Sequence, residues 1–265
     1  MKKRPLGQNF LIDESVADEI VEIARIDEDD HVVEIGPGKG VLTRRLTDRA
    51  ARVTAIEIDG KLIGPLKNEM SEATNFTLLN EDALKFDFGS IKGPYKVVSN
   101  LPYYAAAHIL KRLIVFRKNI QDMTLMLQKE VVDRFSAQPG SRCYGSLTVF
   151  LQYHCTVERL LEVGRLAFSP PPKIESSVVR LTPLAKPKID TVDEKLFFKI
   201  VSAAFFHKRK MLKNNLQIWD RQFRNEQGSL QLAGIDLSRR AETLTLQDFA
   251  DLSNHIHQHQ NNEPS

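Results

Sequence analysis

The sequence predicts an α/β protein with an open parallel sheet that binds a ligand at one edge, followed by a small helical domain. Short apolar runs alternate with helical patterns in the first half of the chain. Four of those runs end in a glycine loop or in polar residues, as strands that border a binding crevice do. The segment Pro183 to Pro187 has the composition of a linker, and helical patterns follow it. We therefore expect domains at residues 1–184 and 185–265.

The composition is that of a globular protein in water. Hydrophobic residues make up 42% of the 265 residues and charged residues 27%. No run approaches the ~20 apolar residues of a membrane span, and no apolar signal core follows the charges of Lys2 to Arg4. Cys143 and Cys155 lack metal-binding or CxxC spacing. We expect a cytoplasmic protein with reduced cysteines, no metal and no membrane contact.

Positive charge is concentrated in one part of the chain. The net charge is only +3, but residues 165–224 contain 13 Lys and Arg against 5 Asp and Glu. This distribution favours a polyanionic partner, although a solvated charged face would give the same count.

The chain begins with the polar and apolar motif Gly7-Gln8-Asn9-Phe10-Leu11. A helix is expected to begin at Asp13, because apolar residues follow at helical spacing. The motif would either close over a bound ligand or anchor the terminus, and on this segment alone the anchor is the simpler interpretation.

A glycine loop then joins an expected strand, His31 to Ile35, to an expected helix. Gly36, Gly38 and Gly40 would let the backbone approach a ligand closely. The next apolar run ends at Glu57, whose carboxylate can accept from both hydroxyls of a ribose. No GK[ST] follows the glycines, which argues against an NTPase. A cofactor without a diphosphate and a dinucleotide both remain open.

Two more expected strands end in polar residues. Phe76 to Asn80 is followed by Asp82, and Tyr95 to Ser99 is followed by Asn100. Because ligands bind outside the carboxyl ends of parallel strands, the four strand ends should share one crevice. Asp82 would accept from the amino group of a cofactor's adenine, or would cap a helix.

The tetrapeptide Asn100-Leu101-Pro102-Tyr103 can form a receptor for a flat base with an exocyclic amine. The Asn100 side chain and the Leu101 carbonyl can each accept a hydrogen bond, because Pro102 favours an extended conformation at Leu101. Tyr103 can stack on the base. Alone, Asn-x-Pro is an ordinary turn signal.

The rest of the first domain is expected to alternate helices and strands. The consecutive prolines after Phe168 favour a polyproline conformation that would hold its ring at a fixed position, or they form a simple hairpin connector. The expected helices are Ile109 to Phe116, Lys129 to Ser136 and Ser146 to Tyr153, and the expected strands are Met123 to Gln128, Thr156 to Val163 and Ser176 to Leu181.

These motifs together resemble the ribosomal RNA adenine N6,N6-dimethyltransferase family, most closely its bacterial small-subunit (16S) branch. The resemblance covers nearly the whole chain and is far more specific than any one motif. It is carried, in order, by Gly7 to Leu11, Glu34 to Thr43, Glu57, Asp82, Asn100 to Tyr103 and Phe168 to Lys173. It implies a Rossmann-like class I S-adenosylmethionine-dependent methyltransferase fold with a small C-terminal helical domain.

The resemblance also implies a substrate and a set of site residues. S-adenosyl-L-methionine would donate two methyl groups to N6 of each of two adjacent adenosines near the 3′ end of small-subunit rRNA. The partner would be this RNA in an immature ribosomal particle, late in subunit biogenesis, and the protein would act as a monomer. The implied cofactor-binding residues are Asn9, Leu11, Gly36, Gly38, Gly40, Glu57, Asp82 and Asn100. The catalytic residues are expected to be Asn100, Leu101, Pro102, Tyr103 and Phe168.

The second domain is expected to bind RNA. The run Thr191 to Glu194 has the form of a capping box that begins a helix, and Lys208, Arg209, Lys210 and Lys213 follow as a cationic cluster. Family members usually carry a Gln-Arg-Arg-Lys-like run here, so a bidentate arginine contact at Lys208 is in question. Leu230 to Leu252 is expected to form short helices. The tail His255 to Ser265 is expected to be disordered rather than to bind a metal.

Three other functions compete with this interpretation. A large-subunit enzyme of the antibiotic-resistance type would share the site. An assembly factor would depend on binding more than on catalysis. A dinucleotide oxidoreductase is disfavoured by the GxGxG spacing and by Asn-Leu-Pro-Tyr.

Overall fold

The computed structural model describes residues 9–219 and 236–262. The chain divides into two compact units, each built from two segments. The first unit comprises residues 1–132 and 156–185, and the second comprises 133–155 and 186–265. The later junction lies one residue beyond the expected boundary at 184/185. The expected division, however, left residues 133–155 in the first domain.

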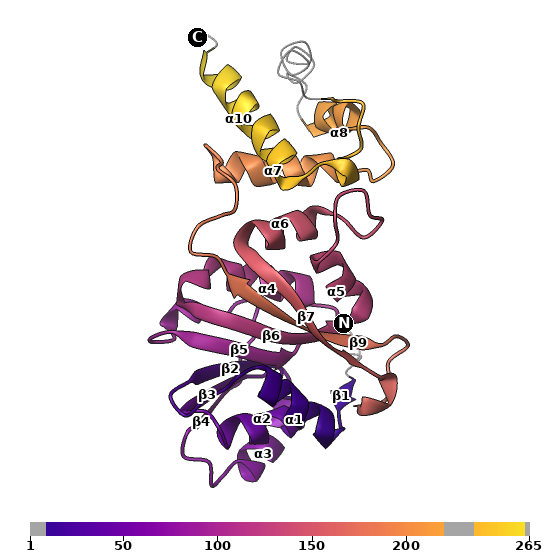
Figure 1. Cartoon of the computed structure of the whole chain (residues 1–265). Helices are drawn as coiled ribbons and strands as arrows, with labels where there is room; N and C mark the ends of the chain where they lie inside the picture. The colour runs from indigo at the N-terminus through magenta and orange to yellow at the C-terminus, as the bar shows by residue number, and fades with distance from the viewer. Residues whose placement is uncertain (1–8, 220–235, 263–265) are drawn as a thin grey trace. The chain divides into compact units, whose positions relative to one another are not determined.

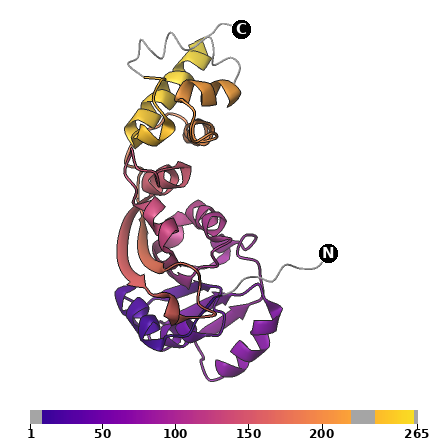
Figure 2. The same ribbon diagram turned by 90° about the vertical axis from the view of Figure 1, so that its right-hand side faces the viewer.

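The first unit is organised around a seven-stranded sheet with strand order β4-β3-β2-β5-β6-β9-β7 (Figure 1). Strands β4, β3, β2, β5 and β6 run parallel, and β9 pairs antiparallel to β6. Strands β7 and β9 lie side by side and curve along their length (Figure 2). The strands are β2 (His31–Ile35), β3 (Arg52–Ile56), β4 (Phe76–Leu79), β5 (Tyr95–Asn100), β6 (Ile120–Gln128), β7 (Cys155–Val163) and β9 (Ser176–Pro183).

The order of the strands creates a switch point between β2 and β5. From β2 the chain moves outward to β3 and β4, whereas from β5 it moves in the opposite direction to β6. Parallel crossovers are right-handed, so connections that leave in opposite directions place their helices on opposite faces. A crevice therefore opens at the carboxyl ends of β2 and β5.

Helices cover the sheet, and two of them, α1 and α3, begin at an aspartate that caps the first turn. Helix α1 begins where the sequence predicts, because the Asp13 carboxylate accepts hydrogen bonds from the backbone N–H groups of Ser15 (3.0 Å) and Val16 (3.3 Å). Its buried face packs with α2 and β2 in one hydrophobic cluster. The helices are α1 (Glu14–Ile23), α2 (Val41–Thr47), α3 (Gly60–Glu69), α4 (Ala106–Val115) and α5 (Lys129–Phe135).

A two-stranded ladder fixes the start of the described chain. Strand β1 (Phe10–Leu11) pairs antiparallel with β8 (Phe168–Ser169), and the backbone N–H of Ile12 donates to the Ala167 carbonyl at 2.8 Å. The predicted anchoring role of this segment is therefore confirmed for Phe10 and Leu11. Gln8 lies outside the described residues.

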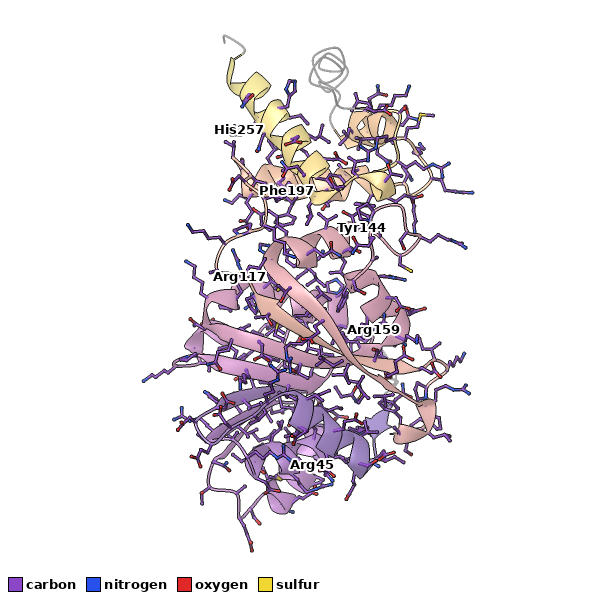
Figure 3. All side chains as sticks on the ribbon, viewed as in Figure 1. Arg45, Arg117, Tyr144, Arg159, Phe197 and His257 are labelled. Carbon is purple, nitrogen blue, oxygen red and sulfur yellow. The ribbon has the colours of Figure 1, made fainter. Side chains whose placement is uncertain are left out.

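The described part of the second unit is helical and has its own core. It contains α6 (Ser146–His154), α7 (Glu194–Ala204), α8 (Leu212–Trp219) and α10 (Leu246–Asn262). Tyr144 and Phe197, labelled in Figure 3, are 1% and 0% exposed and belong to one hydrophobic cluster.

Two expectations for this unit are corrected. Helix α7 is capped by Asp193, which accepts from the N–H groups of Lys195 and Leu196, whereas the Thr191 hydroxyl bonds to Tyr153 at 2.8 Å. The expected disordered tail is helical as far as Asn262, because Ile256 is buried in the core and holds α10 in place. Residues 230–235 of the expected short helices lie outside the described ranges.

The two predicted absences concern membranes and metals. None of the helices in residues 9–219 and 236–262 is long and apolar enough to cross a membrane. The same residues contain no group of three or more His, Cys, Asp or Glu side chains that could hold a metal ion.

Candidate active site

A cleft of about 1220 Å³ opens at the carboxyl ends of the parallel strands. It is lined by the glycine loop after β2, by Glu57 after β3, by Asp82 after β4 and by Asn100 to Tyr103 at the end of β5. The structure therefore brings together the four strand ends that the sequence predicted to meet.

The glycine loop approaches the cleft in a conformation that side chains resist. Gly36, Gly38 and Gly40 have φ angles of 72°, 59° and 77°. A Cβ atom at Gly38 would lie 3.0 Å from Cδ1 of Phe10, and one at Gly40 would lie 2.7 Å from Cδ1 of Leu66. Glycine is therefore favoured in this loop by the left-handed backbone and by the side-chain atoms that a Cβ atom would meet.

Two carboxylates follow the next strands, and one of them, Glu57, bonds to this loop. Glu57 is 2% exposed and accepts hydrogen bonds from the N–H groups of Asp59 (2.8 Å) and Gly38 (3.3 Å). Burial raises the pKa of Glu57, and these backbone hydrogen bonds oppose the shift. Asp82 accepts from the Leu84 N–H at 2.9 Å in a tight turn, and no helix begins there, so the helix-cap alternative is wrong.

The end of β5 presents an amide oxygen with no partner. Oδ1 of Asn100 is buried and accepts no hydrogen bond from any described residue. The backbone N–H of Leu101 donates to the Met126 carbonyl at 3.1 Å, which fixes the main chain beside it. The Tyr103 hydroxyl bonds to Oγ of Ser176 at 2.7 Å, and burial raises its pKa, so this phenol stays neutral near pH 7. A buried acceptor without a donor is costly unless a ligand supplies one.

Comparison with known proteins decides the family. Residues 1–258 match the model described as "Ribosomal RNA adenine dimethylase". The chain is 46% identical over 255 residues to the ribosomal RNA small subunit methyltransferase A of Clostridium acetobutylicum, covering 95% of this chain and 92% of that one. The chain belongs to the ribosomal RNA adenine dimethylase family.

Two solved structures have a fold similar to that of this chain. A dimethyladenosine transferase from Plasmodium falciparum aligns with a TM-score of 0.77 at 26% identity, covering 92% of this chain and 95% of that one. The 23S rRNA methyltransferase ErmE aligns with a TM-score of 0.71 at 26% identity, covering 94% of this chain and 100% of that one. The predicted class I methyltransferase fold and the predicted enzyme class are confirmed, and a dinucleotide oxidoreductase is excluded.

The structure does not bring every predicted residue of the dimethylase site into the cleft. Asn9 and Leu11 line it, but Gly40 does not. Phe168 is 1% exposed and belongs to the hydrophobic cluster beneath α1. Its pairing with Leu11 across β1 and β8 turns the ring into the core. The residues that follow it, 171–174, line the cleft instead. The assignment of Phe168 to the face of a target base is therefore corrected for this conformation.

Glu34 and Tyr104 are among the cleft residues that the sequence analysis missed. Glu34 is 2% exposed, accepts a hydrogen bond from the Thr43 hydroxyl at 2.7 Å, and lines the cleft. A carboxylate inside an apolar run directly before the glycine loop was the available signal. Tyr104 also lines the cleft and is 61% exposed. It was overlooked because the adjacent Tyr103 satisfied the expected stacking role.

The cationic cluster of the dimethylase lies in the second unit. Lys208, Arg209 and Lys210 are exposed, and Lys213 is half-buried. Lys208 Nζ donates to the Arg142 carbonyl at 2.7 Å, so part of its bonding capacity is used within the unit. Arg209 and Lys210 present their charges to solvent.

Proposed function

We propose that this protein dimethylates N6 of two adjacent adenosines near the 3′ end of small-subunit rRNA, within an immature particle, late in subunit biogenesis. The observation that carries the proposal is the buried, unpartnered Oδ1 of Asn100 at the end of β5, where the cleft offers an acceptor to an exocyclic amine. Family membership and the small-subunit relative support this substrate.

The residues present fit S-adenosylmethionine as the methyl donor. Buried Glu57 keeps acceptor capacity for ribose hydroxyls, and Asp82 offers a carboxylate to an adenine amine. The Gly38 backbone leaves room for close approach. When bound, the donor supplies a methyl group on a positively charged sulfur. The described part of the chain offers no metal cluster beside this cleft, and this reaction class requires none.

The end of β5 can raise the reactivity of adenine N6. The N6 lone pair is delocalised into the ring, which makes the amine a poor nucleophile. Acceptors at Asn100 Oδ1 and at the Leu101 carbonyl bind both amine protons and favour a pyramidal nitrogen whose lone pair faces the methyl group. Positioning of this kind can lower a barrier by several kcal/mol. Tyr103 is held through Ser176 and can stack on the base.

Proton loss follows methyl transfer in this scheme. Asn100 to Tyr103 contains no carboxylate that could act as a general base, so the proton leaves after the nitrogen has become cationic. The second transfer starts from an amine with one N–H. Either of the two acceptors can hold that proton, and the cleft volume of about 1220 Å³ leaves room for the first methyl group.

The test is transfer of labelled methyl groups, followed by mapping of the modified adenosines. The purified protein is incubated with labelled donor and immature small-subunit particles. We expect two adjacent doubly methylated adenosines, and we expect the Asn100→Ala variant to lose at least ~100-fold in rate. The same variant should lose much less affinity for S-adenosylhomocysteine, measured by calorimetry.

Three outcomes would overturn the proposal. Undiminished turnover by the Asn100→Ala variant would remove the assignment of the site. Methylation of naked large-subunit RNA in preference to the particle would favour the activity named for the similar ErmE structure. Full rescue of subunit maturation in a deletion strain by this variant would favour an assembly factor.

A further inference from the structure

Tyr104 lines the cleft but takes no part in the chemistry described above. Its side chain is 61% exposed, although its neighbours Leu101 and Ala105 are 1% and 5% exposed. Among the described residues, no hydrogen bond to its hydroxyl is present. An aromatic ring exposed on the wall of a concave, largely apolar site is a surface that a flat ligand can cover.

The sheet order separates the surroundings of Tyr103 from those of Tyr104. Tyr103 reaches toward β9 and bonds to Ser176 there, on one side of β5. Strands β3 and β4 lie on the other side of β5. The carboxylates of Asp82 and Glu57, which follow these strands, raise the pKa of Tyr104 in addition to the larger effect of burial. Tyr104, Asp82 and Glu57 line the same cleft.

The cleft that Tyr104 lines also contains exposed apolar side chains. Ile58, directly after Glu57, is 49% exposed, and Leu84, two residues after Asp82, is 40% exposed. Both line the cleft. The carboxylates can bind the polar edges of a nucleoside, and the apolar side chains together with the Tyr104 ring can cover its flat faces.

We propose that Tyr104 is a donor-binding residue whose ring packs against the adenine of the methyl donor. The two adjacent tyrosines then divide the cleft, with Tyr103 on the side of the target base and Tyr104 on the side of the donor nucleoside. This inference rests on the proposed function, because it takes Glu57 and Asp82 to be donor-binding residues.

The test measures binding and not turnover. Dissociation constants are measured by calorimetry for S-adenosylhomocysteine and for 5′-methylthioadenosine, which lacks the amino-acid half. We expect Tyr104→Ala to weaken both ligands by a similar factor, about 10- to 100-fold, as for loss of a base–aromatic stack. Tyr104→Phe keeps the ring and should bind both ligands within about twofold of the wild type.

A matched control removes exposed apolar surface outside the cleft. Val115 is 67% exposed at the end of α4 and does not line the cleft, so Val115→Ala should bind both ligands as the wild type does. Thermal melting checks the fold of Tyr104→Ala, which removes a mostly exposed ring and should melt close to the wild type.

The possible failures are distinguishable. If the wild-type protein binds neither ligand, the proposed function fails and this inference fails with it. If the wild type binds both and Tyr104→Ala binds equally well, only the role of Tyr104 is overturned. Loss of S-adenosylhomocysteine affinity without loss of methylthioadenosine affinity would place Tyr104 at the amino-acid half. Equal losses in Tyr104→Phe and Tyr104→Ala would assign the effect to the hydroxyl and overturn the role of the ring.

Discussion

Glu34 shows how a single buried carboxyl group can set the electrostatics of the cleft. It is 2% exposed in β2, and burial raises its pKa from 4.5 to about 8. The hydrogen bond from Thr43 opposes this shift, and the charge of Glu57 adds to it. The neutral acid is therefore the main form near pH 7. A neutral Glu34 adds no negative charge to a cleft that Glu57 and Asp82 also line, and these two residues face the donor in the proposed function.

This raised pKa predicts a pH-dependent stability. Below pH 4.5 the Glu34 carboxyl is protonated in both folded and unfolded chains. Between pH 4.5 and about 8 the unfolded chain loses the proton while the folded protein keeps it, so the free energy of unfolding falls as pH rises. Glu34→Gln removes this effect. Relative to the wild type, we expect the variant to become more stable by a few kcal/mol between about pH 5 and about pH 8.5.

Urea unfolding of the free protein at the two pH values measures this difference. Glu28→Gln is the matched control, because Glu28 is exposed before β2 and the same substitution there should show no such trend. A stability difference between Glu34→Gln and the wild type that is independent of pH would contradict the raised pKa.

At the scale of elements, the sequence predicted the strands that end at the cleft, because each combines a short apolar run with a local signal. Gly36 and Asn100 mark two such ends, and parallel topology brings them together. The position of Phe168 could not be predicted in this way. Its burial depends on pairing between β1 and β8, which are separated by most of the first unit in sequence. The order of the expected tail likewise depends on a tertiary contact, because Ile256, the buried apolar residue of an otherwise polar segment, packs with Phe249 and Leu252 of the same helix in the core of the second unit.

The glycine loop offers a test at this scale. Gly38→Ala must accept a φ of 59° and a Cβ atom 3.0 Å from the Phe10 ring. A left-handed conformation costs a residue with a side chain roughly 1–2 kcal/mol, and displacement of Phe10 from its place beside the loop adds to this. We expect the free energy of unfolding to fall by about 1–3 kcal/mol, measured by urea denaturation.

Gly164→Ala is the control for that substitution. Gly164 has a φ of −67°, and no heavy atom lies within 4 Å of the position of its Cβ. The alanine should leave stability unchanged or raise it by about 0.4–1 kcal/mol, because it reduces the freedom of the unfolded chain. If Gly38→Ala and Gly164→Ala lowered the free energy of unfolding equally, neither the positive φ of Gly38 nor its contact with Phe10 would explain the need for glycine at this position.

At the scale of the whole molecule, the helical unit combines residues 133–155 with the C-terminal region. The sequence could not predict this composition of the unit. The chain passes between the two units three times, and the linker signal at Pro183 to Pro187 marks only one of these crossings. The crossing near Val132 falls inside α5, and the crossing near Cys155 falls where α6 runs directly into β7, so neither has the composition of a linker. Tyr144 and Tyr153 from the earlier segment pack in one cluster with Phe197 and Phe249 from the later one.

This division predicts that RNA affinity and donor affinity can be changed separately. Arg209 and Lys210 are exposed in the second unit, and the cleft is lined by residues of the first. If both cations contact phosphates, Arg209→Ala/Lys210→Ala should weaken binding to small-subunit rRNA and reduce the slope of log K against log salt concentration by about 1.4–1.8. Calorimetry with S-adenosylhomocysteine should give the wild-type dissociation constant.

The control must remove the same charge from a different place. Lys92 and Lys118 are exposed and precede β5 and β6, at the amino ends of the parallel strands and therefore at the edge of the sheet opposite the cleft. Lys92→Ala/Lys118→Ala should keep the wild-type salt slope. The control could instead lose as much of the salt slope as Arg209→Ala/Lys210→Ala does. Net charge, and not the cationic cluster, would then attract the RNA. An unchanged slope in Arg209→Ala/Lys210→Ala would remove these two residues from the RNA interface, because counterion release requires that a cation lie against a phosphate.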